Sequence, residues 1–434
     1  MNESRKPSFK QSFEARRRVE SLSRDDLTAH QLSALNGLLE TILPHNAFYA
    51  EKLGNLTLPI ESLADFRKLP ETTKPELVGR DDDYARNRTY PLAEYTRFHR
   101  TSGTHGRPTI VVDTVDDWQW WIDTWQFVLD AAAVTVEDRV LMAFSFGPFI
   151  GFWSANDALF ARGAMVIPAG GLSSLGRLEL LESSQATAAC CTPSYALHLA
   201  EVAKQNGIDL ASSSVTRLIV AGEPGGSVPS IRKRIESSWA AQVIDHSGAS
   251  EVGPWGYASA DGTSLHVVES EFISEFESIE TGSPAKEGEL SELIITTLGR
   301  TGCPLIRYRT GDLVRPSWSH EGNNFVLLQG GVLGRTDDMM VIRGVNVFPS
   351  AVEQILCTFP EVDEYRMTAY KNGAMDAMRI EVEDRAGDPS RIAKELNLRL
   401  GLNVNVELVD VGTLPRFESK GKRFVDQRRS QLDA

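Results

Sequence analysis

The sequence predicts an α/β protein with a large N-terminal domain, whose mostly parallel sheets are covered by helices, and a small C-terminal α+β domain. Short apolar runs alternate with helical patterns between residues 140 and 244, as in a parallel sheet with both faces covered. The chain has 434 residues and is therefore longer than a domain built around a single hydrophobic core usually is. Asp337 and Asp338 lie between two glycine turns, and we expect a polar joint there between domains 1–336 and 337–434.

The elements can be placed in order along the chain. Apolar spacing predicts mostly helix over about the first 90 residues. Strands are then expected at 95–98 and 110–112, and a helix at 116–134 carries Trp118, Trp120, Trp121 and Trp125, which we interpret as packing residues. Buried strands follow at 140–144, 165–168, 187–191, 217–221 and 242–244, with helices at 155–162 and 194–206. A helix at 351–358 and a strand at 379–382 indicate the α+β character of the C-terminal part.

Composition excludes several classes of partner. Lys and Arg number 45 against 59 Asp and Glu, a net charge of −14, which argues against nucleic acid or an anionic membrane. The four cysteines show no Cys-x-x-Cys spacing and fit a reducing compartment. The first residues have no apolar signal core, and no run approaches the ~18 apolar residues of a membrane span. We therefore expect a cytoplasmic protein; its oligomeric state stays open, with a homodimer as one option.

A loop of hydroxyl side chains and glycines between the strands at 95–98 and 110–112 is typical of phosphate binding. Glycine allows the backbone to approach a ligand, while hydroxyls and free N–H groups donate to phosphate oxygens. The loop does not end in Gly-Lys-Ser/Thr, so it is not a Walker P-loop. An ordinary turn without a ligand is the alternative. The candidate phosphate-binding residues are Thr101, Ser102, Gly103, Thr104 and Gly106.

Three further segments carry polar residues after predicted strands. Glu251 ends the segment 245–251, where a carboxylate beside glycine can reach a metal–phosphate complex. Asp312 ends 307–312 and is the type of short carboxylate that accepts from ribose hydroxyls, although a turn aspartate is an equal alternative. Arg335 precedes the polar joint. A fourth segment, 419–423 near the C-terminus, is basic and contains Gly421.

Together these segments resemble the adenylate-forming superfamily, and more closely its phenylacetate-CoA ligase branch. The resemblance rests on residues 97–104, 190–197, 305–312 and 334–350, in one order along the chain, and extends from about Phe66 to Asp426. Such enzymes join a carboxylate to the α-phosphate of ATP, release pyrophosphate, and then pass the acyl group to a thiol. The protein contributes positioning and charge stabilisation. The resemblance implies ATP and Mg²⁺, CoA as the thiol co-substrate, and a C-terminal domain that is mobile.

The resemblance also implies a role for each matching residue. Glu251 would bind Mg²⁺ and act in catalysis, Asp312 would accept the ribose hydroxyls, and Arg335 would contact ribose or phosphate. Asp337 would be the hinge. Arg343 and Gly344 would lie on the thiol side, toward CoA. The remaining ATP- or AMP-binding residues would be Gly222, Glu223, Pro224, Ser247, Gly248 and Ser250.

Two lysines compete for the catalytic position that stabilises charge on the α-phosphate. Counting back from Arg423 favours Lys420, although Ser419 stands where the family usually has glycine. Reading from Gly421 instead favours Lys422 but loses the arginine spacing. We take Lys420 as the catalytic lysine. Two other departures are Ser247, in place of an aromatic residue, and Arg107, in place of lysine. No cysteines cluster near His266, so we predict no structural zinc.

The acid is predicted to be aromatic, because the segment 144–153 is rich in aromatic residues and an aromatic cleft suits an aryl or arylacetic acid. His246, Ser247 and Ser145 are candidates to bind a ring hydroxyl or amine. A carrier-protein thiol could replace CoA, and a non-catalytic nucleotide-binding protein that keeps the fold is the alternative of another class. The candidate acyl-pocket residues are Phe144, Phe146, Phe149 and Trp255.

Overall fold

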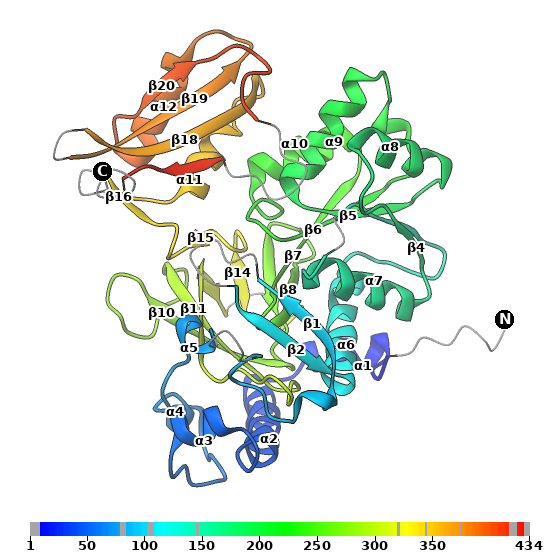
Figure 1. Cartoon of the computed structure of the whole chain (residues 1–434), viewed down its shortest axis with the longest axis vertical. Helices are drawn as coiled ribbons and strands as arrows, with labels where there is room; N and C mark the ends of the chain where they lie inside the picture. The colour runs from blue at the N-terminus through cyan, green and yellow to red at the C-terminus, as the bar shows by residue number, and fades with distance from the viewer. Residues whose placement is uncertain are drawn as a thin grey trace.

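The computed structural model describes residues 9–78, 84–101, 108–144, 147–318, 322–342, 345–372, 375–415 and 423–428. Within these ranges the structure is a mixed α/β fold with a large N-terminal domain and a smaller C-terminal one (Figure 1). No helix in the described ranges combines the length and apolarity that a membrane crossing needs.

The chain begins with short helices, as the apolar spacing predicts. Ser12 and Ser23 cap the first two by accepting hydrogen bonds from backbone N–H groups of the first turn. The longest, α2, buries leucines along one face, among them Leu35 and Leu39. The helices are α1 Phe13–Glu20, α2 Arg24–Ile42, α3 Ala47–Leu53, α4 Leu63–Phe66 and α5 Lys74–Leu77.

A nine-stranded sheet forms the centre of the large domain, in the order β13-β14-β9-β8-β7-β6-β5-β3-β4. Five neighbouring strands are parallel, as the alternating pattern predicts: β3 Arg139–Met142, β4 Met165–Pro168, β5 Ala188–Cys191, β6 Arg217–Val220 and β7 Gln242–Ala249. The others pair antiparallel: β8 Gly253–Ala258, β9 Ser264–Val267, β13 Pro316–Ser317 and β14 Leu327–Gln329.

Alternate side chains of the parallel strands enter two different cores. Val140 and Met142 pack in a cluster with residues of α6 and α7, while Leu141 packs with residues of α8, α9 and α10. Both faces of the parallel strands are therefore covered, which explains their short, uniformly apolar sequences. The helices are α6 Val115–Ala131, α7 Ile150–Arg162, α8 Ser174–Ser183, α9 Pro193–Gln205 and α10 Pro229–Trp239, with 3₁₀ turns at Leu92–Glu94 and Leu210–Ser212.

Two antiparallel units complete the large domain. A hairpin pairs β1 Tyr95–Arg100 with β2 Ile110–Thr114, and the candidate phosphate loop connects its strands. A four-stranded sheet in the order β10-β11-β12-β15 contains β10 Phe272–Ser278, β11 Ser291–Thr297, β12 Tyr308–Val314 and β15 Gly334–Arg335. This second sheet is antiparallel throughout, so among the named strands of the large domain only β3–β7 pair in parallel.

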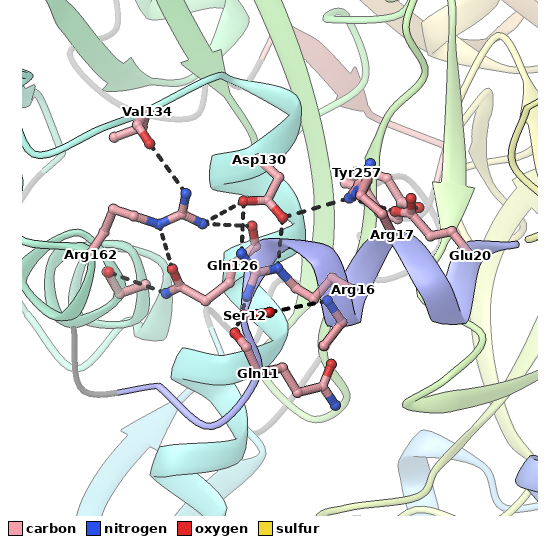
Figure 2. A network of polar contacts seen from close by, with 12 residues as sticks. Gln11, Ser12, Arg16, Arg17, Glu20, Gln126, Asp130, Val134, Arg162 and Tyr257 are labelled. Carbon is pink, nitrogen blue, oxygen red and sulfur yellow. Dashed lines mark hydrogen bonds and ion pairs between the residues drawn. The ribbon is translucent and has the colours of Figure 1, made fainter. Parts of the chain in front are cut away.

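The N-terminal helix is tied to the domain by a buried ion-pair network (Figure 2). Asp130, at the end of α6, is 1% exposed and accepts from Arg16 of α1 at 2.6 Å and from Arg162 of α7 at 2.7 Å. Glu20, at the end of α1, accepts from the Tyr257 hydroxyl on β8 at 2.6 Å. The network thus fixes α6 and β8 relative to each other, next to the site described below.

The C-terminal elements have a hydrophobic core of their own. They lie beside α10 (orange and red in Figure 1), where Arg234 donates to the Val362 carbonyl at 3.0 Å and Ser230 to the Gln354 carbonyl at 3.2 Å. Sheet order is β20-β19-β18-β21, with β16 and β17 paired separately. The elements are β16 Met340–Ile342, β17 Val345–Val347, α11 Pro349–Leu356, β18 Val362–Asn372, β19 Met375–Asp384, α12 Pro389–Leu400, β20 Asn405–Leu408 and β21 Phe424–Asp426. A boundary at residue 337 stays our proposal.

Candidate active site

Glu251 lies in the turn between β7 and β8 and is 7% exposed. The ammonium group of Lys74 lies 2.8 Å from its carboxylate, and the hydroxyl of Tyr308 donates to the same oxygen at 3.5 Å. Because the buried Glu251 carboxylate already pairs with the Lys74 ammonium group, this place in the structure favours positive charge. One carboxylate together with phosphate oxygens is also a set that Mg²⁺ prefers, so these residues fit that ion.

Lys74 reaches Glu251 because the segment before α5 is bound to β12. Thr72 donates to the Arg307 carbonyl at 2.8 Å, and Arg309 donates to the Thr72 carbonyl at 2.9 Å. Thr73 then begins α5 through a capping box with Glu76. Sequence reasoning missed Lys74, because the strand β12 that positions its segment is more than 230 residues away and neither segment carries a motif for the pairing.

A fully buried arginine connects the Glu251 turn to the phosphate-loop hairpin. Arg300 donates to Asp113 of β2 at 2.8 Å, and its guanidinium also donates to the backbone carbonyl of Glu251. Burial raises the pKa of the Asp113 carboxyl above its ordinary value, and the charge of Arg300 opposes that rise. Sequence reasoning missed this pair as well. Removing either partner would leave an uncompensated buried charge.

The candidate phosphate loop is closed at its base by Thr101 and Thr109. Thr101 donates its N–H to the Thr109 carbonyl at 3.0 Å, and Thr109 donates to the Thr101 hydroxyl at 3.0 Å. Arg100 donates to the Pro148 carbonyl at 2.8 Å, so this base lies against the loop that precedes α7. The other predicted members lie outside the described residues: Ser102, Gly103, Thr104 and Gly106.

Asp312, Arg335 and Asp337 are brought together as one cluster. Asp312 and Arg335 are paired across β12 and β15, and the guanidinium donates to Asp312 at 2.9 Å and to Asp337 at 2.8 Å. Gly311 has φ +78°, and a Cβ there would lie 2.9 Å from the Arg335 guanidinium, so this turn requires glycine. The predicted ribose acceptor and the predicted hinge therefore share one arginine.

The loop after β6 contains Gly222, Glu223 and Pro224. Glu223 accepts from the Ser194 N–H, at the start of α9, at 2.7 Å. This carboxylate therefore stabilises a helix N-terminus, where negative charge is favourable. Gly222 has φ +93°, which allows the sharp turn after β6.

The residues just before Glu251 differ in burial. Ser247 and Ser250 are half-buried, whereas Gly248 is exposed, and a Cβ at Gly248 would lie 2.8 Å from the Gly253 carbonyl. Asp245 is buried and accepts from Ser227 at 2.6 Å, and burial raises its pKa to about 6. His246 is buried too, and burial lowers its pKa to about 4.

The described acyl-pocket residues differ in burial. Trp255 is 1% exposed and belongs to the main core, with Phe144 partly buried against it. Phe149 is 46% exposed, so in this structure it does not line an enclosed pocket. Phe146 lies outside the described residues, as does Ser145.

Four predicted C-terminal residues also lie outside the described residues: Arg343, Gly344, Lys420 and Lys422. The chain resumes at Arg423, whose guanidinium pairs with Glu364 of β18, and β21 then runs parallel to β18. Arg423, the first described residue after both candidate lysines, is thus fixed on the small domain.

Comparison with known proteins gives two family matches. Residues 98–272 match the AMP-binding enzyme family, and residues 344–428 match the AMP-binding enzyme C-terminal domain. The chain is 31% identical to a phenylacetate-coenzyme A ligase of Escherichia coli (strain K12), over 94% of this chain and 97% of that protein.

Two solved structures of a 2-hydroxyisobutyryl-CoA ligase are similar to the fold at 25% identity. The structure in the postadenylation state, with R3-HIB-AMP, gives a TM-score of 0.90 over 98% of this chain and 95% of the other. The structure with 2-HIB-AMP and CoA in the thioesterification state gives 0.72 over 98% and 97%.

Proposed function

Because this chain belongs to the phenylacetate-CoA ligase-like branch of the adenylate-forming AMP-binding enzymes, we propose that its acid substrate is an aryl or arylacetic acid. The protein is an AMP-forming acid–CoA ligase that uses ATP and Mg²⁺, with CoA as co-substrate. This activity sets aside the non-catalytic alternative, and it makes CoA the expected acceptor rather than a carrier-protein thiol.

We assign the residues of the site to the first half-reaction as follows. Glu251 would hold Mg²⁺, which when bound neutralises phosphate charge. Asp312 and Arg335 would bind the ribose, and the backbone of 222–224 would lie along the adenine. Thr101 begins the loop that would hold the phosphates. Lys420 would stabilise the charge that develops on the α-phosphate while the acid carboxylate attacks it.

One observation supports an aromatic acid: aromatic side chains from three elements belong to the core that also contains Val252, the residue after Glu251. Trp125 of α6, Phe152 of α7 and Trp255 of β8 belong to one cluster, against which Phe144 and Trp153 pack. Aromatic walls bind planar rings through stacking and edge contacts. Trp255 is only four residues after Glu251, so a ring bound against it would have its carboxylate close to the phosphates.

A small hydroxy acid is the second candidate. The postadenylation structure of the 2-hydroxyisobutyryl-CoA ligase covers nearly the whole chain with a TM-score of 0.90, and that enzyme binds a short branched acid. Acid specificity depends on a few pocket side chains, so similarity of fold alone does not choose between the two acids.

The arrangement of the two domains supports assigning this structure to the conformation that forms the acyl-adenylate. The fold matches the postadenylation structure better than the thioesterification structure of the same neighbour, 0.90 against 0.72. Rotation at Asp337 would then bring a different face of the C-terminal domain to the site for thiol attack. In the present arrangement Arg335 holds Asp337 by an ion pair.

The test is acid-dependent release of pyrophosphate from Mg²⁺-ATP, with and without CoA. The panel contains benzoate, phenylacetate, their hydroxy and amino derivatives, 2-hydroxyisobutyrate and a straight-chain fatty acid. Aryl acids are expected to give the highest kcat/KM, with acyl-CoA formed only when CoA is present. A clear preference for 2-hydroxyisobutyrate would replace the aromatic assignment by the second candidate, and a preference for the fatty acid would contradict both.

A further inference from the structure

Trp125 and Trp255 differ from the other buried tryptophans in the hydrogen bonding of their indole N–H groups. Five of the eight tryptophans donate their indole N–H to an oxygen: Trp118 to Asp157 at 2.8 Å, Trp120 to Glu271 at 2.7 Å, Trp121 to Asp113 at 3.3 Å, Trp153 to the Gly147 carbonyl at 2.9 Å and Trp239 to the Ala196 carbonyl at 2.9 Å. Trp125 and Trp255 are 3% and 1% exposed, and among the described residues their N–H groups have no acceptor. A buried donor without an acceptor is costly, which calls for a specific explanation.

Both tryptophans lie on the same side of the sheet as His246. The His246 ring is 4.4 Å from the Trp125 ring, and His246 is the cross-strand partner of Tyr257. Trp255 is two residues from Tyr257 on β8, so both side chains point to the face that α6 covers. The contact of Phe127 on α6 with Tyr257, 5.7 Å between ring centres, confirms which face this is.

The state of the His246 ring follows from its one hydrogen bond. Nδ1 lies 2.7 Å from the Gly256 carbonyl, and a carbonyl can only accept, so Nδ1 carries a proton. Burial lowers the pKa of His246 to about 4, which makes the imidazole neutral at pH 7. Nε2 is therefore an acceptor, and no hydrogen bond reaches it from the part of the chain that the structure describes.

These groups offer two donors and one acceptor inside an otherwise apolar cluster. A hydroxyl group is the smallest substituent that satisfies both kinds, because its oxygen accepts from an indole N–H while its proton is donated to Nε2. An aromatic amine would donate to Nε2 but is a poor acceptor for the indoles. A plain phenyl ring would satisfy neither.

We propose that Trp125, Trp255 and His246 recognise a hydroxyl group on the acyl part of the substrate, so that the preferred acid is a hydroxy-substituted acid. The inference rests on the proposed function, and it holds for a hydroxyaryl acid and for a short hydroxy acid alike. His246 is on β7, five residues before Glu251 in the turn that follows, so the hydroxyl would bind on the side of the acyl group that faces away from the phosphates. The three residues determine specificity and take no part in the chemical step.

The first experiment compares pairs of acids that differ only in one hydroxyl, using pyrophosphate release by the wild-type chain. The pairs are benzoate with its three ring-hydroxylated isomers, phenylacetate with its three, and isobutyrate with 2-hydroxyisobutyrate. At least one hydroxy acid is expected to exceed its parent by about 10²-fold in kcat/KM, the size of effect that follows when buried polar groups are left unpaired by the wrong ligand. Equal values in every pair, or a preference for an amino derivative, would overturn the inference and leave the proposed function intact.

The second experiment removes one polar atom at a time. Trp125→Phe and Trp255→Phe keep an aromatic ring without the N–H, and His246→Leu removes the acceptor. Each should lower kcat/KM for the preferred hydroxy acid by about tenfold or more beyond any loss seen with its unsubstituted parent, so the ratio between the two acids falls. A ratio unchanged in all three variants would overturn the inference, and the paired-acid comparison in wild type decides the matter if a variant does not fold.

His266→Leu is the matched control. This histidine is also buried on the same sheet, beside Tyr257 at 5.6 Å, with its Nδ1 3.2 Å from the Phe325 carbonyl. Its replacement should leave the ratio between hydroxy acid and parent unchanged. Absence of pyrophosphate release with every acid would instead contradict the proposed function, and with it the inference.

Discussion

The ammonium group of Lys74 lies 2.8 Å from the buried carboxylate of Glu251. The two residues come from segments far apart in the chain, α5 and the turn between β7 and β8, and Tyr308 of β12 contacts the same carboxylate oxygen. If Glu251 binds Mg²⁺ during the reaction, Lys74 competes with the ion for that oxygen. The contact between Lys74 and Glu251 would therefore have to open when the ion binds.

Replacing Lys74 with Met should lower the Mg²⁺ concentration that gives half-maximal pyrophosphate release by several-fold, because a competing cation is removed. The measurement is a Mg²⁺ titration of the adenylation half-reaction at saturating acid. Lys68→Met is the control, since Lys68 is 75% exposed and pairs with Asp65 in its own segment. A higher Mg²⁺ requirement in Lys74→Met would instead show that the lysine assists the metal–phosphate complex.

Burial of His99 should make the free energy of unfolding depend on pH. It is 3% exposed and stacks on Trp118 with ring centres 5.3 Å apart, and burial lowers its pKa from 6.5 to about 4. The unfolded chain therefore binds a proton below pH 6.5 that the folded chain does not bind until about pH 4. The contribution of His99 is present above pH 6.5 and is lost as the pH falls toward 4.

His99→Phe isolates this contribution, because other buried groups titrate in the same range. Between pH 7 and pH 5 the variant should lose about 2 kcal/mol less free energy of unfolding than the wild type. The measurement is urea denaturation at both pH values. Equal losses in the two proteins would mean that His99 is protonated in the folded chain.

Lys420→Ala should abolish adenylate formation and leave thioester formation from a pre-made acyl-adenylate largely intact. The lysine belongs to the C-terminal part of the chain, which we propose to rotate at Asp337, and it would contact the α-phosphate only in the adenylating arrangement. Loss of one preorganised charge contact typically costs ~10²–10³ in rate. Lys422→Ala should be mild, and both half-reactions are measured separately in both variants. If Lys422→Ala is the inactive one, the assignment of the catalytic lysine is off by two residues.

The parts of the fold that local sequence determines were predictable. The strands β3–β7 are short apolar runs between helices, and the turns that follow β6 and β7 could be recognised by their glycines and carboxylates. The antiparallel sheet of β10, β11, β12 and β15 was not predicted, because pairing direction depends on partners distant in sequence. For the same reason Lys74 and Arg300 were missed: each has a polar partner more than 170 residues away, and an isolated cation in a sequence does not indicate its partner.

The central claim is that the Glu251 turn is the metal–phosphate site of an acyl-adenylating enzyme. Its most direct test is acid-dependent exchange of labelled pyrophosphate into ATP, measured for the wild type and for Glu251→Gln, which keeps the shape of the side chain and removes its charge. The wild type should show exchange, and the variant should lose about 10²-fold or more of that rate while its affinity for the acid changes little. Unchanged exchange in Glu251→Gln would show that this carboxylate is structural and would contradict the account.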